Sequence, residues 1–187
     1  MKDRFLFLKH WAKTPLRTAS LTPSSRALAK IMVSGISPET GSMLELGPGT
    51  GVFTKAAIER GVPEGNITLV ELNKTFASLL RERFPLARTL EISAADLARI
   101  QPLRDGKIGV VLCGIGLPSL PREQVHAILD GAFKLLKPDG AFHQFTYGLW
   151  CPIPETILKP LGLEATKIGS TWRNFPPASV YRIARTA

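Results

Sequence analysis

The stretch that decides the fold is Met43-Leu44-Glu45-Leu46-Gly47-Pro48-Gly49-Thr50-Gly51-Val52-Phe53-Thr54. It reads as a short apolar strand, a turn with three glycines at alternate positions, and the beginning of a helix. A glycine turn at the carboxyl end of a strand lets the backbone approach a ligand closely, and the first N–H groups of the helix point at that ligand. We therefore expect the centre of a ligand site at residues 45–51.

Strands and helices alternate on the carboxyl side of this stretch. We expect strands at residues 43–46, 66–71, 87–92, 108–113 and 141–146, helices at 52–60, 73–84 and 122–136, and a turn at 137–140. Two further strands, at 163–171 and 179–185, are joined by a proline-rich turn and read as an antiparallel hairpin. This order predicts a doubly wound α/β sheet with a mixed edge, in one domain over residues 1–187 whose core is 43–187.

The chain has 187 residues and a net charge of +9, with a pI near 9.9. Such a basic surface favours anionic partners, namely nucleic acid or an acidic membrane. No apolar run approaches the roughly 20 residues of a membrane span. The two cysteines, Cys113 and Cys151, have no partner at the spacing of metal ligands. We expect an intracellular protein with reduced thiols, without a metal site and without a membrane-spanning helix.

Residues 1–36 are rich in positive charge and are expected to form two helices, at 3–13 and 23–34. The first is amphipathic, with a basic stripe beside an apolar face. The residues of these two faces are Phe5, Leu8, Trp11, Lys9, Lys13 and Arg17. Such a helix can bind an anionic bilayer, where each basic residue contributes about 1 kcal/mol. The alternative is an ordinary surface helix that packs its apolar face on the domain.

Three acids lie at the carboxyl ends of the expected strands, where ligands of such sheets bind. They are Glu45, Glu71 and Asp96. Glu71 lies 20 residues after Gly51, a suitable place for a carboxylate that accepts both hydroxyls of a ribose. The turn has the spacing Gly-x-Gly-x-Gly rather than the Gly-x-Gly-x-x-Gly of dinucleotide sites, and Glu45 suits a cationic ligand better than a pyrophosphate. NAD binding is therefore the weaker interpretation.

Residues 45–54 resemble the glycine segment of class I S-adenosylmethionine (SAM) methyltransferases. Segments along nearly the whole chain resemble the bacterial phospholipid N-methyltransferases, which convert phosphatidylethanolamine to phosphatidylcholine. The segments are 7–13 with Pro15, 23–29, 45–54, 117–121, 144–148 and 172–182. The resemblance implies a Rossmann-like fold with a mostly parallel seven-stranded sheet, a carboxyl-terminal antiparallel hairpin and amino-terminal helices at the membrane.

The resemblance also implies SAM as the methyl donor and S-adenosylhomocysteine as a product. With SAM as the ligand, Glu45 is expected near the methionine ammonium, Glu71 at the ribose hydroxyls and Asp96 at the adenine amine. The full set of expected SAM-binding residues is Glu45, Gly47, Gly49, Thr50, Gly51, Glu71, Ala95 and Asp96. Residues 93–96, Ser-Ala-Ala-Asp, stand where a Gly-Asp-Ala type sequence is common in the family, and the acid is kept.

Tyr147 is the expected catalytic contact of the acceptor amine, because it follows the fifth strand and offers an oxygen and an aromatic face to a methylated ammonium. In this interpretation Phe145, Trp150 and Trp172 complete an aromatic surround. The residues expected at the lipid headgroup and its phosphate are Trp172, Arg173, Tyr181 and Arg182. Core packing for the aromatic residues and a solvated charged face for the arginines are the alternatives. His143 reads as a packing residue rather than a base.

Two other functions remain open at this point. RNA adenine N6-dimethyltransferases have a very similar glycine segment, but they clamp a flipped base with an Asn/Asp-Pro-Pro-Tyr/Phe-like sequence after strand four. Residues 113–118, Cys-Gly-Ile-Gly-Leu-Pro, lack both the Asn and the aromatic residue. A peripheral membrane protein that binds SAM or lipid without turnover is the other alternative. The favoured interpretation is a phospholipid methyltransferase on the cytoplasmic face of the inner membrane, with no nucleic-acid partner and no inferred protein partner.

Overall fold

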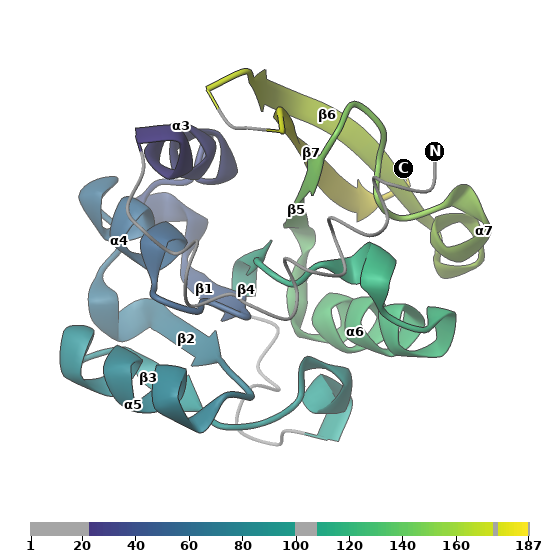
Figure 1. Ribbon diagram of the computed structural model, residues 1–187. Helices are drawn as coiled ribbons and strands as arrows, with labels where there is room; N and C mark the ends of the chain where they lie inside the picture. The colour runs from purple at the N-terminus through teal and green to yellow at the C-terminus, as the bar shows by residue number, and fades with distance from the viewer. Residues whose placement is uncertain (1–22, 100–107, 174–175, 187) are drawn as a thin grey trace.

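The computed structural model describes residues 23–99, 108–173 and 176–186. Their strands form one seven-stranded sheet in the order β3-β2-β1-β4-β5-β7-β6. The first five strands along the chain pair in parallel, whereas β7 is antiparallel to both β5 and β6. In Figure 1 helices α3, α4 and α5 cover one face of this sheet, and α6 and α7 cover the other. The predicted fold class is confirmed.

The elements within the described ranges have the following bounds. The strands are β1 Ser42–Leu46, β2 Ile67–Val70, β3 Arg88–Leu90, β4 Ile108–Cys113, β5 Leu136–Tyr147, β6 Leu163–Thr171 and β7 Ala178–Arg185. The α-helices are α3 Pro23–Met32, α4 Val52–Glu59, α5 Lys74–Arg83, α6 Arg122–Leu135 and α7 Glu155–Leu158. Short 3-10 turns are η1 Pro38–Thr40, η2 Glu64–Asn66, η3 Ala94–Arg99, η5 Leu117–Ser119 and η6 Lys159–Leu161.

The central strands are apolar because helices cover both of their faces. In β1, Leu44 and Leu46 pack into the cluster with α6, while Met43 packs into the opposite cluster with α3 and α4. All three side chains are fully buried. Glu45 shares the face of Met43 by the alternation of the strand, so its carboxylate is directed toward α4. The sheet therefore carries a charged group into its interior at the carboxyl end of β1.

The carboxyl-terminal hairpin is fastened to the rest of the fold at both ends. Near the hairpin turn, a Cβ on Gly169 would lie 2.7 Å from Cγ2 of Ile31, so the glycine lets α3 approach β6. At the other end, the Arg185 guanidinium donates to the carbonyl oxygens of Lys137 (2.7 Å) and Pro138 (3.1 Å). It also donates to the carbonyl oxygens of Phe133 and Leu136. Arg185 thus joins the end of β7 to the junction between α6 and β5.

One expectation about local structure was wrong, and one short helix was not predicted. The predicted turn at 137–140 lies inside β5: Ile108 pairs with Leu136 and Val110 with Ala141, so four residues bulge opposite Gly109. The backbone is crowded here, since a Cβ on Gly109 would lie 1.7 Å from the carbonyl oxygen of Thr40. Helix α7 was not expected, because four residues are too short to show a helical period.

The amino-terminal prediction is tested only in part. Helix α3 ends at Met32 rather than at residue 34, and Ser34 Oγ donates to the carbonyl oxygen of Ile31 (2.8 Å) in the turn that follows. The predicted helix at 3–13 and all six proposed membrane-contact residues lie outside the described residues. Among the described helices, none is both long enough and apolar enough to cross a membrane.

Candidate active site

The glycine turn sits at the carboxyl edge of the sheet between β1 and α4. Gly47, Gly49 and Gly51 all have positive φ, at 64°, 55° and 77°, which side chains other than glycine disfavour. The turn is held by Gly47 N–H, which donates to the carbonyl oxygen of Val70 (2.9 Å), and by Gly51 N–H, which donates to that of Pro48 (2.8 Å). The turn is therefore fixed between β1 and the end of β2.

The three glycines differ in what surrounds them. A Cβ on Gly47 would lie 2.7 Å from Cγ1 of Ile115, and one on Gly51 would lie 2.3 Å from Cε2 of Phe84. A Cβ on Gly49 would meet nothing within 4 Å. Gly47 and Gly51 are thus required by packing beneath the turn, whereas Gly49 leaves space for a ligand against the backbone.

Glu45 is a fully buried acid beside this turn. Its Oε2 accepts a hydrogen bond of 2.6 Å from Thr54 Oγ1 in α4, and its Oε1 has no partner among the described residues. Burial raises the pKa of Glu45 to about 7; the hydrogen bond from Thr54 opposes this shift and the charge of Glu71 adds to it. A buried acceptor without a donor is costly, so the site fits a ligand that brings a cation or a donor.

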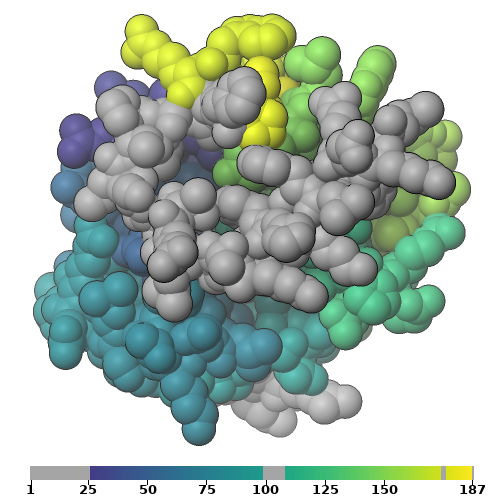
Figure 2. Space-filling view, viewed as in Figure 1, coloured from purple at the N-terminus to yellow at the C-terminus, as the bar shows by residue number. Residues whose placement is uncertain are grey.

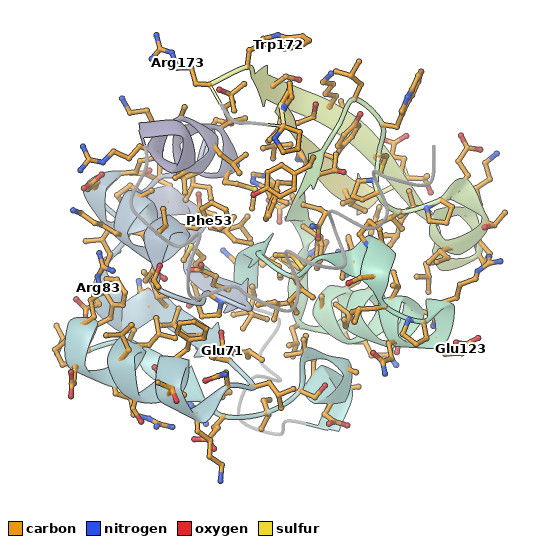
Figure 3. The ribbon with its side chains drawn as sticks, in the orientation of Figure 1. Phe53, Glu71, Arg83, Glu123, Trp172 and Arg173 are labelled. Carbon is orange, nitrogen blue, oxygen red and sulfur yellow. The ribbon has the colours of Figure 1, made fainter. Side chains whose placement is uncertain are left out.

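Glu71 links the glycine turn to the start of α5. Its Oε2 accepts from the backbone N–H of Gly49 (3.1 Å) and its Oε1 from that of Asn73 (2.9 Å). Asn73 caps α5 by accepting from the N–H groups of Thr75 and Phe76, as predicted. Figure 3 shows Glu71 near the middle of the molecule, on the sheet side of α5. A carboxylate held in this way is placed to accept from a diol that lies over Gly49.

The remaining predicted SAM residues lie on either side. The carbonyl oxygen of Thr50 accepts from Nη1 of Arg83 in α5 (2.7 Å). Ala95 and Asp96 lie in η3, which packs against α6. The backbone N–H groups of Ala95 and Asp96 donate to Oγ (3.2 Å) and O (3.0 Å) of Ser93. Ser93 thus supports the turn that presents Asp96.

Two residues of this region were not identified from the sequence as site residues: Gly114, which follows β4, and Gln144 in β5. A Cβ on Gly114 would lie 2.5 Å from the carbonyl oxygen of Gly47, and the Gly114 N–H donates to that of Leu46 (2.8 Å). Gln144 in β5 is fully buried, and its Nε2 donates to the carbonyl oxygens of Ile115 (3.1 Å) and Phe145 (2.8 Å). Its Oε1 is unpartnered within the described part of the chain. The sequence signal for Gln144 was a polar residue inside an otherwise apolar strand.

Tyr147 lies at the end of β5 in a row of aromatic rings. The Tyr147 ring contacts that of Phe145 edge-on, with centroids 5.5 Å apart, and Phe145 contacts Phe53 at 5.9 Å. Phe53 is in the first turn of α4, next to Thr54, so the row runs from the glycine turn to the end of β5. Burial raises the pKa of the Tyr147 hydroxyl, which therefore stays protonated at neutral pH.

The four residues predicted at the lipid headgroup are not brought together. Trp172 and Arg173 are exposed and point outward at the top of Figure 3, away from Phe53 and Glu71. Tyr181 is buried, and its hydroxyl donates to the carbonyl oxygen of Leu149. Arg182 lies on the opposite face of β7 from Tyr181, because neighbouring residues of a strand alternate.

Arg182 and His143 line a cavity of about 480 Å³ at the amino end of β4, opposite the glycine turn. His143 donates from Nδ1 to the carbonyl oxygen of Met32 (2.8 Å). Burial lowers its pKa, an effect that the bond to Met32 opposes and the charge of Arg182 increases. His143 is thus an uncharged residue that holds α3 on the sheet. No cluster of metal ligands occurs in the described ranges.

These features fit SAM. The unpartnered Oε1 of buried Glu45 can accept a hydrogen bond from the ligand ammonium. Glu71 can accept from the ribose hydroxyls, and the open space at Gly49 permits close approach of the ligand. When bound, SAM supplies a methyl group on a positively charged sulfur.

Comparison with known proteins shows the family of the chain. The family model described as a methyltransferase domain matches residues 43–140, and the chain belongs to the class I SAM-dependent methyltransferases. A crystal structure of 1,6-didemethyltoxoflavin-N1-methyltransferase from Burkholderia thailandensis, with bound S-adenosylhomocysteine, has the same fold with a TM-score of 0.65. It is 16% identical, and the match covers 99% of this chain and 87% of that one. SAM, not NAD, is the cofactor.

One relative is similar to this chain over nearly its full length. Ornithine lipid N-methyltransferase of Singulisphaera acidiphila is 32% identical over 186 residues, which cover 97% of this chain and 95% of that protein. The ribosomal RNA small subunit methyltransferase A of Maridesulfovibrio salexigens is 38% identical over 103 residues, but these cover only 54% of this chain and 38% of that protein. The full-length similarity is thus to a lipid N-methyltransferase, and the similarity to the RNA enzyme is partial.

The raised pKa of Glu45 predicts that SAM binding depends on pH. If Glu45 pairs with the ligand ammonium, only the carboxylate binds, and protons compete with SAM as the pH falls below about 7. We expect a dissociation constant about eightfold higher at pH 6.0 than at pH 7.5, measured by calorimetry. Glu45→Gln should abolish this difference. Equal affinity of the unmodified protein at both pH values would show that Glu45 is not the partner of the ammonium.

Proposed function

We propose that the protein transfers methyl groups from SAM to the amine of a membrane phospholipid, converting phosphatidylethanolamine through mono- and dimethyl intermediates to phosphatidylcholine. The observation that carries this proposal is the similarity to a lipid N-methyltransferase over nearly the full length of both chains. We place the reaction at the cytoplasmic face of the inner membrane, with residues 1–36 as the membrane-associated part and 43–187 as the catalytic core.

The chain's contribution to the reaction is positioning and exclusion of water. The attacking amine must be neutral and in line with the methyl group, and a well-oriented pair of reactants needs no strong base. In the proposed assignment Glu45 and Glu71 fix the donor at the carboxyl edge, and Tyr147 orients the amine from the end of β5. The rings of Tyr147, Phe145 and Phe53 keep water from the reacting groups and offer an aromatic face to the cationic product.

Tyr147→Phe tests the role of the hydroxyl. This variant keeps the ring and its contact with Phe145 but removes one hydrogen-bonding group. We expect kcat for lipid methylation to fall about tenfold, as loss of a single orienting hydrogen bond predicts, while the dissociation constant of SAM changes less than about twofold. Steady-state kinetics and calorimetry measure the two quantities. An unchanged kcat would remove Tyr147 from the acceptor site.

Ornithine lipid is the second candidate acceptor, favoured by the 32% identity to an ornithine lipid N-methyltransferase. Both lipids offer an amine at a bilayer surface, so the SAM site does not distinguish them. The deciding experiment supplies labelled SAM with three substrates: vesicles of phosphatidylethanolamine, vesicles of ornithine lipid, and ribosomal RNA. Label in phosphatidylethanolamine supports the primary proposal, and label in ornithine lipid alone supports the second candidate. Label in RNA and in neither lipid would overturn both.

A further inference from the structure

The carboxyl edge of the sheet carries an unusual number of exposed apolar side chains. The large apolar residues exposed among the described residues are Leu72, Leu79, Leu86, Leu149, Trp150 and Trp172. Four of the six, Leu72, Leu149, Trp150 and Trp172, lie within three residues of the carboxyl ends of β2, β5 and β6. Trp150 and Trp172 are 84% and 76% exposed, although tryptophan is normally well buried. Such clustering on one edge indicates an interaction surface.

The strand register places three of these residues after strand ends that lie at the same edge of the sheet, with only β7 between them. Tyr147 at the end of β5 pairs with Ala178, and Ala178 pairs with Thr171 at the end of β6. Leu149 and Trp150 follow the first strand, while Trp172 and Arg173 follow the other. We call these four residues the rim. In the space-filling view the green loop after β5 and the yellow hairpin reach the top of the molecule beside one another (Figure 2).

The exposure of the rim is built into the fold. Ser179 Oγ donates to the carbonyl oxygen of Gly148 (2.7 Å), and the Gly148 N–H donates to that of Pro177 (2.9 Å). The hydroxyl of Tyr181 donates to the carbonyl oxygen of Leu149. Since the Ser179 proton is directed to Gly148, Ser170 donates to Ser179 across the hairpin (3.0 Å). The backbone of the loop is therefore fixed to β7, and its apolar side chains are exposed on this fixed backbone.

The chemistry of the rim matches the surface of an anionic bilayer. Tryptophan prefers the headgroup region, where its ring is apolar and its N–H remains hydrated. Arg173 adds a cation beside the two indoles, and the chain as a whole has a net charge of +9, so an acidic surface attracts it. A bilayer on the rim would also lie next to Tyr147, where the proposed function puts the acceptor amine.

We propose that Leu149, Trp150, Trp172 and Arg173 form a second bilayer-contact surface, independent of the amino-terminal helix, that seats the carboxyl edge on the membrane. This inference rests on the proposed function, because it assumes a lipid substrate. It also gives the two exposed tryptophans a different role from the aromatic surround expected from the sequence.

Fluorescence with brominated lipids tests the proposal directly, because the chain has only three tryptophans. Trp11→Phe/Trp172→Phe leaves Trp150, and Trp11→Phe/Trp150→Phe leaves Trp172. Vesicles of phosphatidylethanolamine and phosphatidylglycerol with bromine in the acyl chains are added to each variant. We expect a blue shift of the emission and quenching at both tryptophans. Emission unchanged in both variants, with vesicle binding retained, would overturn the proposal.

Matched leucine variants supply a second measurement. Leu149→Ser in the rim should weaken vesicle binding about threefold or more, whereas Leu86→Ser should not, because Leu86 follows α5 at the opposite edge of the sheet. SAM affinity and melting temperature should be unchanged in both. Equal vesicle binding by the two variants would contradict the proposal that the rim contacts the bilayer. Lipid methylation without quenching would refute the rim and leave the function standing, and quenching without methylation of any lipid would refute the function instead.

Discussion

Replacing Glu45 by glutamine is expected to weaken SAM binding about 100-fold, or about 2.7 kcal/mol, while leaving the protein at least as stable. The amide can still accept the hydrogen bond from Thr54 Oγ1, so the contact between β1 and α4 is kept. What it lacks is the negative charge that the proposed site presents to the ligand ammonium. Calorimetry with SAM and thermal unfolding at pH 8 measure the two effects.

The expected stability follows from the sign of the pKa shift. Because burial raises the pKa of Glu45 from 4.5 to about 7, the unfolded chain loses this proton at lower pH than the folded protein does. The ligand-free protein therefore loses stability as the pH rises from about 4.5 to about 7. At pH 8 the neutral amide removes the cost of a buried charge. The control is Glu59→Gln, since Glu59 is exposed on α4 and pairs with the exposed Lys55 (3.7 Å).

A melting temperature several degrees lower in Glu45→Gln would indicate that the carboxylate has a structural role. Unchanged SAM affinity would remove Glu45 from the cofactor site.

Gly114→Ala is expected to disrupt the glycine turn from the neighbouring strand. The new Cβ would lie 2.5 Å from the carbonyl oxygen of Gly47, and because that atom belongs to the backbone it can move only with the whole turn. We expect a loss of about 1–3 kcal/mol in the free energy of unfolding and a decrease of at least about tenfold in SAM affinity. Denaturant unfolding and calorimetry measure these quantities.

Gly65→Ala is the matched control for this substitution. Gly65 lies in η2, its φ is not positive, and a Cβ there meets nothing within 4 Å. The control should bind SAM normally and unfold at the same denaturant concentration as the unmodified protein. If Gly114→Ala behaved like Gly65→Ala, the turn would be more adaptable than its packing indicates.

The parts of this fold that could be predicted from the sequence are those that short-range patterns determine. The turn between β1 and α4 needs positive φ at Gly47, Gly49 and Gly51, and only glycine provides it readily, so its position is visible in the sequence. The cap of α5 at Asn73 was predicted for a similar reason. The bulge at 137–140 was not, because proline and glycine there indicate a turn, and only the pairing with Ile108 and Val110 shows that the strand continues.

Some residues of the candidate site could likewise be predicted from local sequence, and others could not. Glu45 lies near the carboxyl end of β1, and Glu71 and Asp96 follow β2 and β3, so the rule for ligand positions in α/β sheets identified them as candidates. Gly114 and Gln144 act through contacts with residues that are far away in the sequence, and such contacts leave no local pattern. Trp172 and Arg173 were assigned to the headgroup from their aromatic and charged side chains on the terminal hairpin, and their outward direction depends on where the β6–β7 turn projects from the sheet.

The hydrogen bonds of Arg185 have a consequence for how the carboxyl-terminal hairpin and the end of α6 unfold. Phe133 is in the last turn of α6, Leu136 is the first residue of β5, and Lys137 and Pro138 belong to the β5 bulge. One guanidinium from the last strand therefore satisfies acceptors in both elements. If the hairpin detached, these acceptors would lose their donor together. We therefore expect the hairpin and the end of α6 to unfold together, so that the antiparallel end contributes to the stability of the whole sheet.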